Sequence, residues 1–198
     1  MRYTDTHKAE TRRRVLRVAA AALRARGPDG FSVAEIMAEA GLTHGGFYAH
    51  FPSKDELIAA AVEEAFEDIR RRHLRRSAGK TAPQALAAYI DAYLSPRHRD
   101  SPQSGCPIAA LGSDMPRQSP LVRAAYNKGA AGLLARLEPW MPEVEPLTPR
   151  SLAASVLADM VGAVTLARAI DDADASARLL ADSRRRMRAR TGLAAAQA

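Results

Sequence analysis

Residues 31–57 read FSVAEIMAEAGLTHGGFYAHFPSKDEL, and this stretch decides how the N-terminal part of the chain folds. It predicts two short helices around a tight turn, followed by the start of a longer helix. Ser32 begins a capping box with Glu35, in which the two residues satisfy each other's free backbone donors. Gly41 lacks a side chain and suits the left-handed turn between the two helices. This order of elements is typical of a helix-turn-helix, a motif that reads duplex DNA.

The second helix of the motif, residues 43–50, is short and set by its neighbours, as a recognition helix must be. Thr43 is expected to cap this helix and to offer its hydroxyl to a phosphate. His44, Gly45 and Gly46 form its first turn, which is the part that reaches base edges in the major groove. We therefore expect this turn to face the base pairs.

Aromatic residues set the orientation of the recognition helix. Phe47 and Phe51 lie four residues apart on its inner face and are expected to pin it to the first two helices. Tyr48 and His50 fall outside that face, at a height where both can donate to phosphates. The sequence thus separates an anchoring face from a contact face.

The adjacent glycines Gly45 and Gly46 allow two interpretations. Each costs roughly 0.5–1 kcal/mol relative to alanine inside a helix. Either the bare backbone approaches the DNA closely, or the glycines ease packing at a crowded turn. A zinc site formed by His44 and His50 is not expected, because six residues of an α-helix place them about 240° apart. The sequence offers no further ligands to complete such a site.

Almost every segment of the chain carries the 3.6-residue period of an amphipathic helix, and no alternating run indicates a strand. The fold is therefore expected to be all-α, with about nine helices. These cover residues 6–26, 32–41, 43–51, 53–76, 83–94, 106–113, 120–138, 149–170 and 175–190, and a proline-rich loop is expected at 95–105. We expect a helix-turn-helix DNA-binding domain at 1–52, a connecting helix at 53–76 and a ligand-binding and dimerisation domain at 77–198.

The charge balance fits an anionic partner, because 29 Lys and Arg residues outnumber 22 Asp and Glu residues, which gives a net charge of +7 over 198 residues. The single Cys106 cannot form an internal disulfide, which favours a reducing compartment. The N-terminus is polar and lacks the apolar core of a signal peptide. Asp159 interrupts the most apolar run, residues 152–167, which is expected to fall short of a membrane span. These features predict a soluble cytoplasmic protein.

The N-terminal motif resembles the DNA-binding region of the tetracycline-repressor (TetR) family of bacterial transcriptional regulators. The matching residues are Gly41, Thr43, Gly45, Phe47, Tyr48, His50, Phe51 and the run Ser53, Lys54, Asp55, Glu56 and Leu57. Beyond about the first 60 positions, the chain matches the family only in the number, length and order of its helices. The resemblance implies a homodimer that places two recognition helices in successive major grooves of an operator.

The resemblance also implies roles for individual residues. Those implied to contact the phosphate backbone are Ser32, Thr43, Tyr48, His50 and Lys54, and those implied to face the bases are His44, Gly45 and Gly46. Many relatives carry a longer polar side chain at the position of Gly46, and Ala49 is also bare. We therefore expect direct base readout to rest on His44 and few neighbours, with a larger contribution from DNA shape.

A C-terminal domain that binds a small molecule and releases DNA is a further implication. Its cavity would lie between the fourth, fifth and later helices. The candidate lining residues are Phe66, Tyr89, Tyr93, Cys106, Tyr126, Trp140 and Met160. Ordinary core packing is the alternative for each of them. Because Lys and Arg are scarce among these positions, the effector is expected to be small and mostly apolar.

The last two helices are expected to form the dimer interface, because the helix at 149–170 is apolar on two faces and must be covered on both. A central helix in a monomeric core is the alternative. The expected interface residues are Leu152, Val156, Met160, Ala163, Ala167, Leu180 and Met187. Together they would form a four-helix seam across a two-fold axis.

These features predict a DNA-binding transcriptional regulator, in the first place a repressor that an effector releases from its operator. Cys106 precedes Pro107 and fits a helix N-cap, where the dipole favours a thiolate, so a repressor that senses oxidants or electrophiles is an alternative. An enzyme with Cys106 as nucleophile lacks an evident base and every familiar catalytic motif. An architectural protein that binds DNA without sequence preference is the remaining alternative. We expect no enzymatic activity, cofactor, metal or membrane partner.

Overall fold

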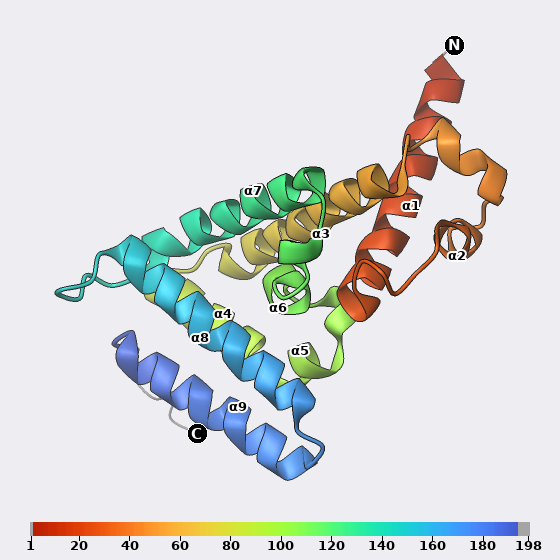
Figure 1. Cartoon of the computed structure of the whole chain (residues 1–198). Helices are drawn as coiled ribbons and strands as arrows, with labels where there is room; N and C mark the ends of the chain where they lie inside the picture. The colour runs from red at the N-terminus through yellow and green to blue at the C-terminus, as the bar shows by residue number, and fades with distance from the viewer. Residues whose placement is uncertain (1, 194–198) are drawn as a thin grey trace. The chain divides into compact units, whose positions relative to one another are not determined.

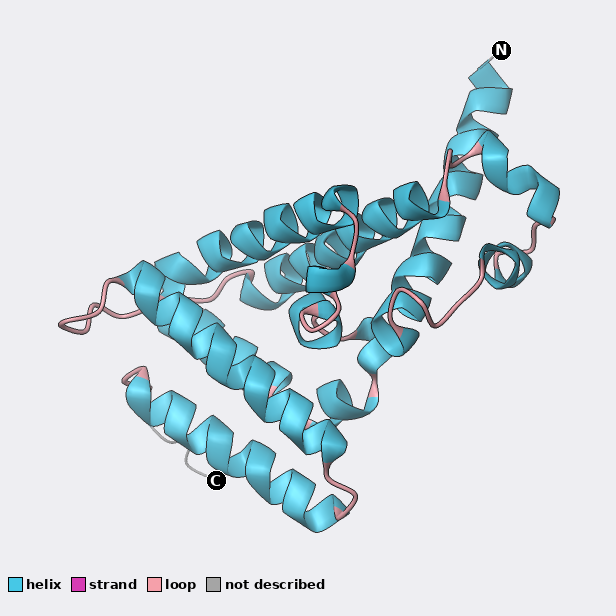
Figure 2. Ribbon diagram, viewed as in Figure 1, coloured by secondary structure: helices cyan, strands magenta, loops and turns pink. Residues whose placement is uncertain are grey.

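The computed structural model of the chain describes residues 2–193. Within this range nine α-helices and four short 3₁₀ helices follow one another, and the only extended pairing is an isolated bridge between Val144 and Leu147 (Figure 2). The prediction of an all-α fold with about nine helices is confirmed.

Figure 1 labels the α-helices in chain order. They are α1 (Arg2–Arg26), α2 (Val33–Glu39), α3 (Lys54–Ser77), α4 (Ala82–Tyr93), α5 (Pro96–Asp100), α6 (Pro107–Leu111), α7 (Pro120–Leu137), α8 (Pro149–Ala169) and α9 (Ala173–Arg190). The 3₁₀ helices are η1 (His44–Ala49), η2 (Pro102–Ser104), η3 (Met115–Arg117) and η4 (Glu138–Trp140).

The capping box at Ser32 and the glycine turn at Gly41 occur as the sequence predicts. Ser32 Oγ accepts from the backbone N–H of Glu35 at 3.2 Å, and Glu35 Oε2 accepts from the backbone N–H of Ser32 at 2.6 Å. Gly41 has a φ of +72°, in the left-handed region that glycine adopts without strain. At the start of α3, Ser53 Oγ accepts from the backbone N–H of Glu56 at 3.2 Å. These bonds define where α2 and α3 begin.

The expected recognition helix is a 3₁₀ helix, η1, and the α-helical geometry assumed for it is wrong. Its backbone bonds span three residues, from Gly46 N to Thr43 O at 3.1 Å and from His50 N to Phe47 O at 2.9 Å. A segment of six residues that contains two glycines has too few four-residue bonds to stabilise an α-helix, and short 3₁₀ pieces are common in such connections.

The loop expected at residues 95–105 is also wrong, because this segment contains α5 and η2. Ser95 Oγ accepts from the backbone N–H of His98 at 3.2 Å and so caps α5. Pro96 follows at the first helical position, where its missing N–H costs nothing and its fixed φ suits the helix. The prolines that indicated a loop therefore begin helices here.

The described chain divides into two compact units, and each is considered by itself. The first comprises Met1–Asp68 and Cys106–Gly129, and the second comprises Ile69–Gly105 and Ala130–Ala198. Helices α3 and α7 each contribute residues to both units.

In the first unit α1 packs against α2 and α6, and α2 packs against η1. The side chains that fill this core include Val15, Ala19, Leu23, Ile36, Met37, Phe47, Phe51 and Leu57, all buried. Arg24 is charged and only 7% exposed, and it forms an ion pair with Asp68 (Nη2 to Oδ2, 3.4 Å). Its Nη1 also donates to the backbone carbonyl of Ala65 at 3.4 Å. The buried guanidinium thus ties α1 to α3.

In the second unit α8 and α9 run side by side in opposite directions (Figure 1), and α8 also packs against α4, α5 and η4. The buried side chains of this core include Leu86, Ile90, Leu133, Leu137, Leu152, Val156, Met160 and Leu180. Arg188 of α9 donates to both carboxylate oxygens of Asp91 on α4, from Nε at 3.1 Å and from Nη2 at 2.7 Å. This bidentate pair fixes the register of α9 on α4.

The expectation that the apolar run falls short of a membrane span is wrong in terms of length and composition. Helix α8 has 21 residues and is apolar enough to cross a membrane by these two criteria, and it is the one such helix among the residues described. The criteria do not distinguish a spanning helix from a core helix. Leu152, Val156 and Met160 are buried between α8 and the helices of its own unit, which is the packing of a core helix.

Gly129 on α7 lies against the ring of Phe66, so a Cβ at this position would be 2.1 Å from Phe66 Cδ2. Phe66 is buried and meets the ring of Tyr126 edge-on, with centroids 5.8 Å apart, so the ring has little room to move. We predict that Gly129→Ala lowers the free energy of unfolding by about 1–3 kcal/mol, as overpacking does in other cores. Denaturant unfolding of the purified variant measures this change.

Gly132 provides the matched control on the same helix. A Cβ there would approach only Arg136 Nη1, at 3.5 Å, which is an ordinary contact. Gly132→Ala is therefore expected to leave the free energy of unfolding unchanged or to raise it by up to about 1 kcal/mol. Equal stability of the two variants would contradict the packing described for Gly129.

Candidate nucleic-acid interface

The 3₁₀ helix η1 is held in place by two aromatic side chains. Phe47 and Phe51 are 2% and 1% exposed, and their rings stack with centroids 5.8 Å apart and an interplanar angle of 25°. A helix of this length has almost no stability of its own, so burial of these two rings must determine its position. The anchoring face inferred from the sequence is therefore the face that is buried.

The opposite face of η1 is open to solvent. Thr43, His44 and Gly45 are exposed, and the Tyr48 side chain is 71% exposed. The Tyr48 ring meets Phe47 edge-on, with centroids 5.2 Å apart, so the exposed phenol stands on a buried anchor. Gly46 and His50 are partly buried beside them. The structure thus brings together the six predicted contact residues from Thr43 to His50.

Packing within the chain does not explain the glycine at position 45. A Cβ on Gly45 would meet no heavy atom within 4 Å, and a Cβ on Gly46 would make only ordinary contacts, the nearest to Met37 Cε at 3.7 Å. Neither glycine has a positive φ. Of the two interpretations of this pair, easier packing is therefore disfavoured, and close approach by an external partner remains.

Thr43 occupies the N-cap position of η1 with an extended backbone, but its side chain makes no capping bond. The expected cap is therefore wrong, which leaves the hydroxyl available to a ligand.

The angular argument against a zinc site at His44 and His50 assumed an α-helix and does not apply to a 3₁₀ helix with three residues per turn. Among the described residues, no group of three or more His, Cys, Asp or Glu side chains could hold a metal.

Lys54 and Ser32, both predicted phosphate contacts, are already engaged within the first unit. Lys54 Nζ donates to the carbonyl of Phe31 at 3.1 Å and lies 5.3 Å from the centroid of the Phe31 ring. The backbone N–H of Ser32 donates to the Glu35 carboxylate. This bond lowers the pKa of the Glu35 carboxyl group, and a hydrogen bond with the Ser32 side chain adds to the effect. Lys54 keeps two N–H donors for a phosphate. Ser32 is less available to a phosphate, because the Glu35 carboxylate lies beside it.

The ring of His50 lies against Phe51, with centroids 6.5 Å apart, and its buried Nδ1 makes no hydrogen bond within the described residues. Burial lowers the pKa of His50, and the positive charges of Lys8 and Arg12 add to this effect. Two cations of α1 therefore lie within electrostatic reach of the recognition helix, although the sequence motif gives no sign of them.

Four of the predicted effector-lining residues lie in the second unit. The Tyr89 ring is 5.6 Å from Tyr93 and 6.2 Å from Trp140, measured between centroids, and Met160 is fully buried. The structure adds His73, whose ring meets Tyr89 edge-on with centroids 4.6 Å apart. The group formed by His73, Tyr89, Tyr93, His98 and Trp140 is called the aromatic cluster below.

Two residues of the aromatic cluster, His73 and His98, were missed by sequence reasoning. Burial lowers the pKa of His73 to about 4, helped by the charges of Arg136, Arg76 and Arg72. Burial likewise lowers the pKa of His98 to about 4, although its hydrogen bond to the Tyr93 carbonyl (2.7 Å from Nδ1) acts in the opposite direction. Both rings are therefore neutral near pH 7. A single histidine beside an arginine-rich stretch gives no periodic signal that could have identified it.

The other three predicted lining residues, Phe66, Cys106 and Tyr126, lie in the first unit. Cys106 occupies the N-cap position of α6, as the sequence predicts, and its side chain is 2% exposed. Burial raises the pKa of Tyr126 to about 12, and an electrostatic interaction with the neighbouring Cys106 adds to this effect. Helix α6 has only five residues, so its dipole contributes little to Cys106.

All seven residues predicted for the dimer interface are buried within the chain itself. They are Leu152, Val156, Met160, Ala163, Ala167, Leu180 and Met187. An open strip of α8 and α9 forms a groove of about 510 Å³, and two of the seven residues, Ala163 and Met187, line it. Its lining includes Asp159, Gly162, Leu166, Leu179, Arg186 and Arg190, of which Leu166 is 60% exposed.

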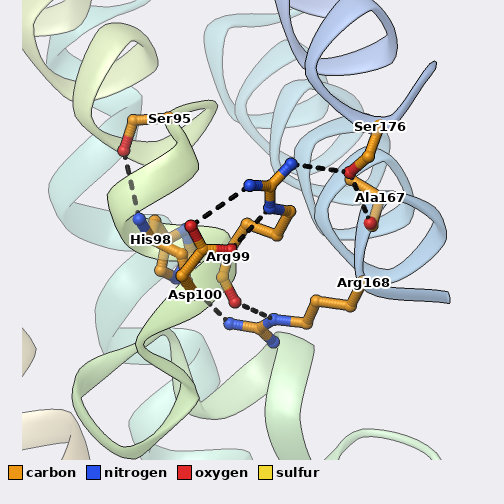
Figure 3. A network of polar contacts seen from close by, with 7 residues as sticks. All are labelled: Ser95, His98, Arg99, Asp100, Ala167, Arg168 and Ser176. Carbon is orange, nitrogen blue, oxygen red and sulfur yellow. Dashed lines mark hydrogen bonds and ion pairs between the residues drawn. The ribbon is translucent and has the colours of Figure 1, made fainter. Parts of the chain in front are cut away.

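A second recess, of about 270 Å³, lies where α5 meets α8 and α9. Figure 3 shows its polar network: Arg99 Nη1 donates to Ser176 Oγ at 2.8 Å, and Ser176 Oγ donates to the carbonyl of Ala167 at 2.6 Å. Arg168 donates to the carbonyls of Arg99 (3.1 Å) and His98 (2.9 Å). These guanidinium groups are used to hold α5 in place, which is a structural role.

The N-terminal part of the chain matches a known family. The family model described as bacterial regulatory proteins, tetR family, covers residues 15–61. The chain is 36% identical over 78 residues to the HTH-type transcriptional regulator CymR of Pseudomonas putida, which is 39% of this chain and 38% of CymR. It is 28% identical over 114 residues to the HTH-type transcriptional repressor NemR of Escherichia coli (strain K12), or 57% of each protein. These matches span less than two thirds of either relative.

Solved structures extend the likeness to nearly the whole chain. The crystal structure of E. coli NemR in its reduced form has a TM-score of 0.77 and 22% identity, covering 96% of this chain and 99% of that one. A TetR transcriptional regulator from Chloroflexus aurantiacus J-10-FL has a TM-score of 0.76 and 28% identity, covering 92% and 94%. The fold beyond the N-terminal motif is therefore shared as well.

The space around Gly45 gives a test that separates folding from binding. We predict that Gly45→Ala leaves the free energy of unfolding unchanged or raises it by up to about 1 kcal/mol, because the methyl group meets no neighbour. The same methyl group is expected to weaken binding to duplex DNA by roughly tenfold, the equivalent of about 1.4 kcal/mol. Thermal unfolding and a gel-shift titration measure the two effects. A destabilised variant, or one that binds DNA as the unaltered chain does, would contradict this role.

Proposed function

The chain belongs to the TetR family of bacterial transcriptional regulators, and on this premise we propose that it binds an operator in duplex DNA as a homodimer. The observation that carries the proposal is the turn from His44 to Gly46, which is exposed at His44 and Gly45 and is held by the buried rings of Phe47 and Phe51. A turn that is both rigid and bare can approach base edges closely in the major groove. Tyr48 and Lys54 would contact the flanking phosphates, and we propose that the protein acts in the cytoplasm.

We propose repression as the mode of regulation, with release by an effector. Effector binding would favour a conformer in which two recognition helices no longer match a half-site spacing of about 34–36 Å. A coupling free energy of roughly 1–3 kcal/mol is typical for such control. The aromatic cluster supports an effector that is small and mostly apolar, because its histidines are neutral and its other members are phenols and an indole.

The open strip of α8 and α9 is the surface that we propose for dimerisation. It presents Leu166 and Leu179 beside Gly162, whose position would accept a Cβ without contact within 4 Å and so leaves room for a partner helix. The polar side chains of the groove are paired within the chain, Arg190 with Asp159 and Arg186 with Ser183 Oγ at 3.3 Å, so the apolar residues are the ones left for a partner. Of the apolar residues first expected at the interface, Ala163 and Met187 line the same groove, and the other five would support it from beneath.

The experiment is a gel shift on DNA that flanks the chain's own gene, with random duplex as competitor. We expect the specific duplex to compete far better than random DNA, whereas equal competition would favour the architectural alternative.

Leu166→Glu is expected to shift the protein toward the monomer in analytical ultracentrifugation and to weaken operator binding by at least about tenfold. Leu121→Glu, at another exposed leucine, is the control. A dimeric Leu166→Glu protein would contradict the proposed interface.

A second candidate function is sensing of oxidants or electrophiles through Cys106, which gains little from its helix N-cap because α6 has only five residues. Its burial opposes it, because a reagent would need a local opening to reach the sulfur. The expected outcome is that a thiol-alkylating electrophile leaves operator affinity unchanged. Loss of affinity in the unaltered chain but not in Cys106→Ser would establish Cys106 as a sensor and overturn this expectation.

A further inference from the structure

The inner face of α1 changes character toward its N-terminal end. Along most of the helix this face is buried, as at Val15 and Ala19. With 100° of rotation per residue, Lys8 and Arg12 lie within about 40° of the line that this buried face follows along the helix, yet both side chains are exposed. The stripe that packs the core therefore continues as a pair of cations beyond the core.

Arg12 is positioned by an aromatic residue of the helix-turn-helix. Its guanidinium carbon lies 4.8 Å from the centroid of Phe51, one of the two rings that anchor η1. A guanidinium group that stacks on a ring uses its flat face, so its N–H groups remain available around its edge. The geometry thus fixes a fork of hydrogen-bond donors immediately beside the recognition helix.

Lys8 lies one turn before Arg12, and the charges of both residues act on the ring of His50. Neither cation forms an ion pair with any side chain of residues 7–193. Two cations on one helical turn, next to residues proposed to face DNA, supply the positive charge that contacts to a phosphodiester backbone require.

We propose that Lys8 and Arg12 form a clamp on the DNA backbone, which contacts phosphates flanking those reached from η1. The inference rests on the proposed DNA-binding function and extends it to a helix outside the recognition motif. The clamp supplies affinity and orientation but no sequence information, since phosphates are the same at every base step. Its ligand is therefore any duplex that the recognition helix engages.

The test measures the affinity of the full chain for an operator duplex as a function of salt concentration. The double variant Lys8→Ala with Arg12→Ala is expected to reduce the slope of log K against log [salt] by about 2, because each phosphate contact contributes about 0.9. Affinity for operator and for random duplex should fall by the same factor. Arg12→Gln, which keeps a planar side chain over Phe51, should reduce the slope by about 1, and thermal unfolding checks that each variant folds.

The control removes the same charge from the opposite side of α1. Arg14 and Arg17 are exposed and lie about 140° and 160° from the midline of Lys8 and Arg12, so their replacement by Ala should leave the slope nearly unchanged. An equal slope for the two double variants, or an unchanged slope in Lys8→Ala with Arg12→Ala, would refute the clamp and leave the proposed DNA-binding function standing. Failure of the unaltered chain to bind any duplex at low salt would refute the proposed function and the clamp together.

Discussion

The stacking of Phe47 on Phe51 is the interaction on which the DNA-reading half depends. The helix that they anchor has six residues, two of them glycines, and lacks a side-chain cap, so its own backbone bonds cannot hold it in place. Everything presented to a partner, from His44 to Tyr48, is positioned through these two rings. Two cations beside the recognition helix are also positioned by aromatic rings, because Arg12 stacks on Phe51 and Lys54 lies over Phe31. Aromatic residues of the core thus orient both the bare turn and the charges around it.

Sequence reasoning succeeded where a local rule applies. The capping box at Ser32 and the glycine turn at Gly41 each depend on residues a few positions apart, and both occur in the structure. The 3₁₀ geometry of η1 could not be predicted in this way, because the four-residue spacing of Phe47 and Phe51 indicates an α-helix, and Phe51 lies beyond the end of η1. At Ser95 and Pro96 the signals for a loop and for a helix start are the same residues, and only the bond from His98 to Ser95 distinguishes them.

The tertiary features of the second unit depend on contacts that a sequence pattern does not specify. A helix that is apolar on two faces must be covered twice, but periodicity does not indicate which face its own chain covers. In α8 the stripe with the larger side chains, such as Val156 and Met160, faces the interior, and the exposed strip contains Leu166. His73 and His98 join the aromatic cluster only through contacts between helices distant in sequence. Lys8 and Arg12 are likewise unremarkable in the sequence until Phe51 and His50 lie beside them.

Arg168 has a consequence for the order in which this part of the chain opens. Helix α5 has five residues, and two of its backbone carbonyls, those of His98 and Arg99, are bonded to a guanidinium group on α8. A helix of this length has little cooperativity of its own, so its amide protons are sheltered only while the C-terminal turn of α8 is intact. The two segments, almost 70 positions apart, therefore form one unit of local unfolding: when the end of α8 frays, α5 melts with it.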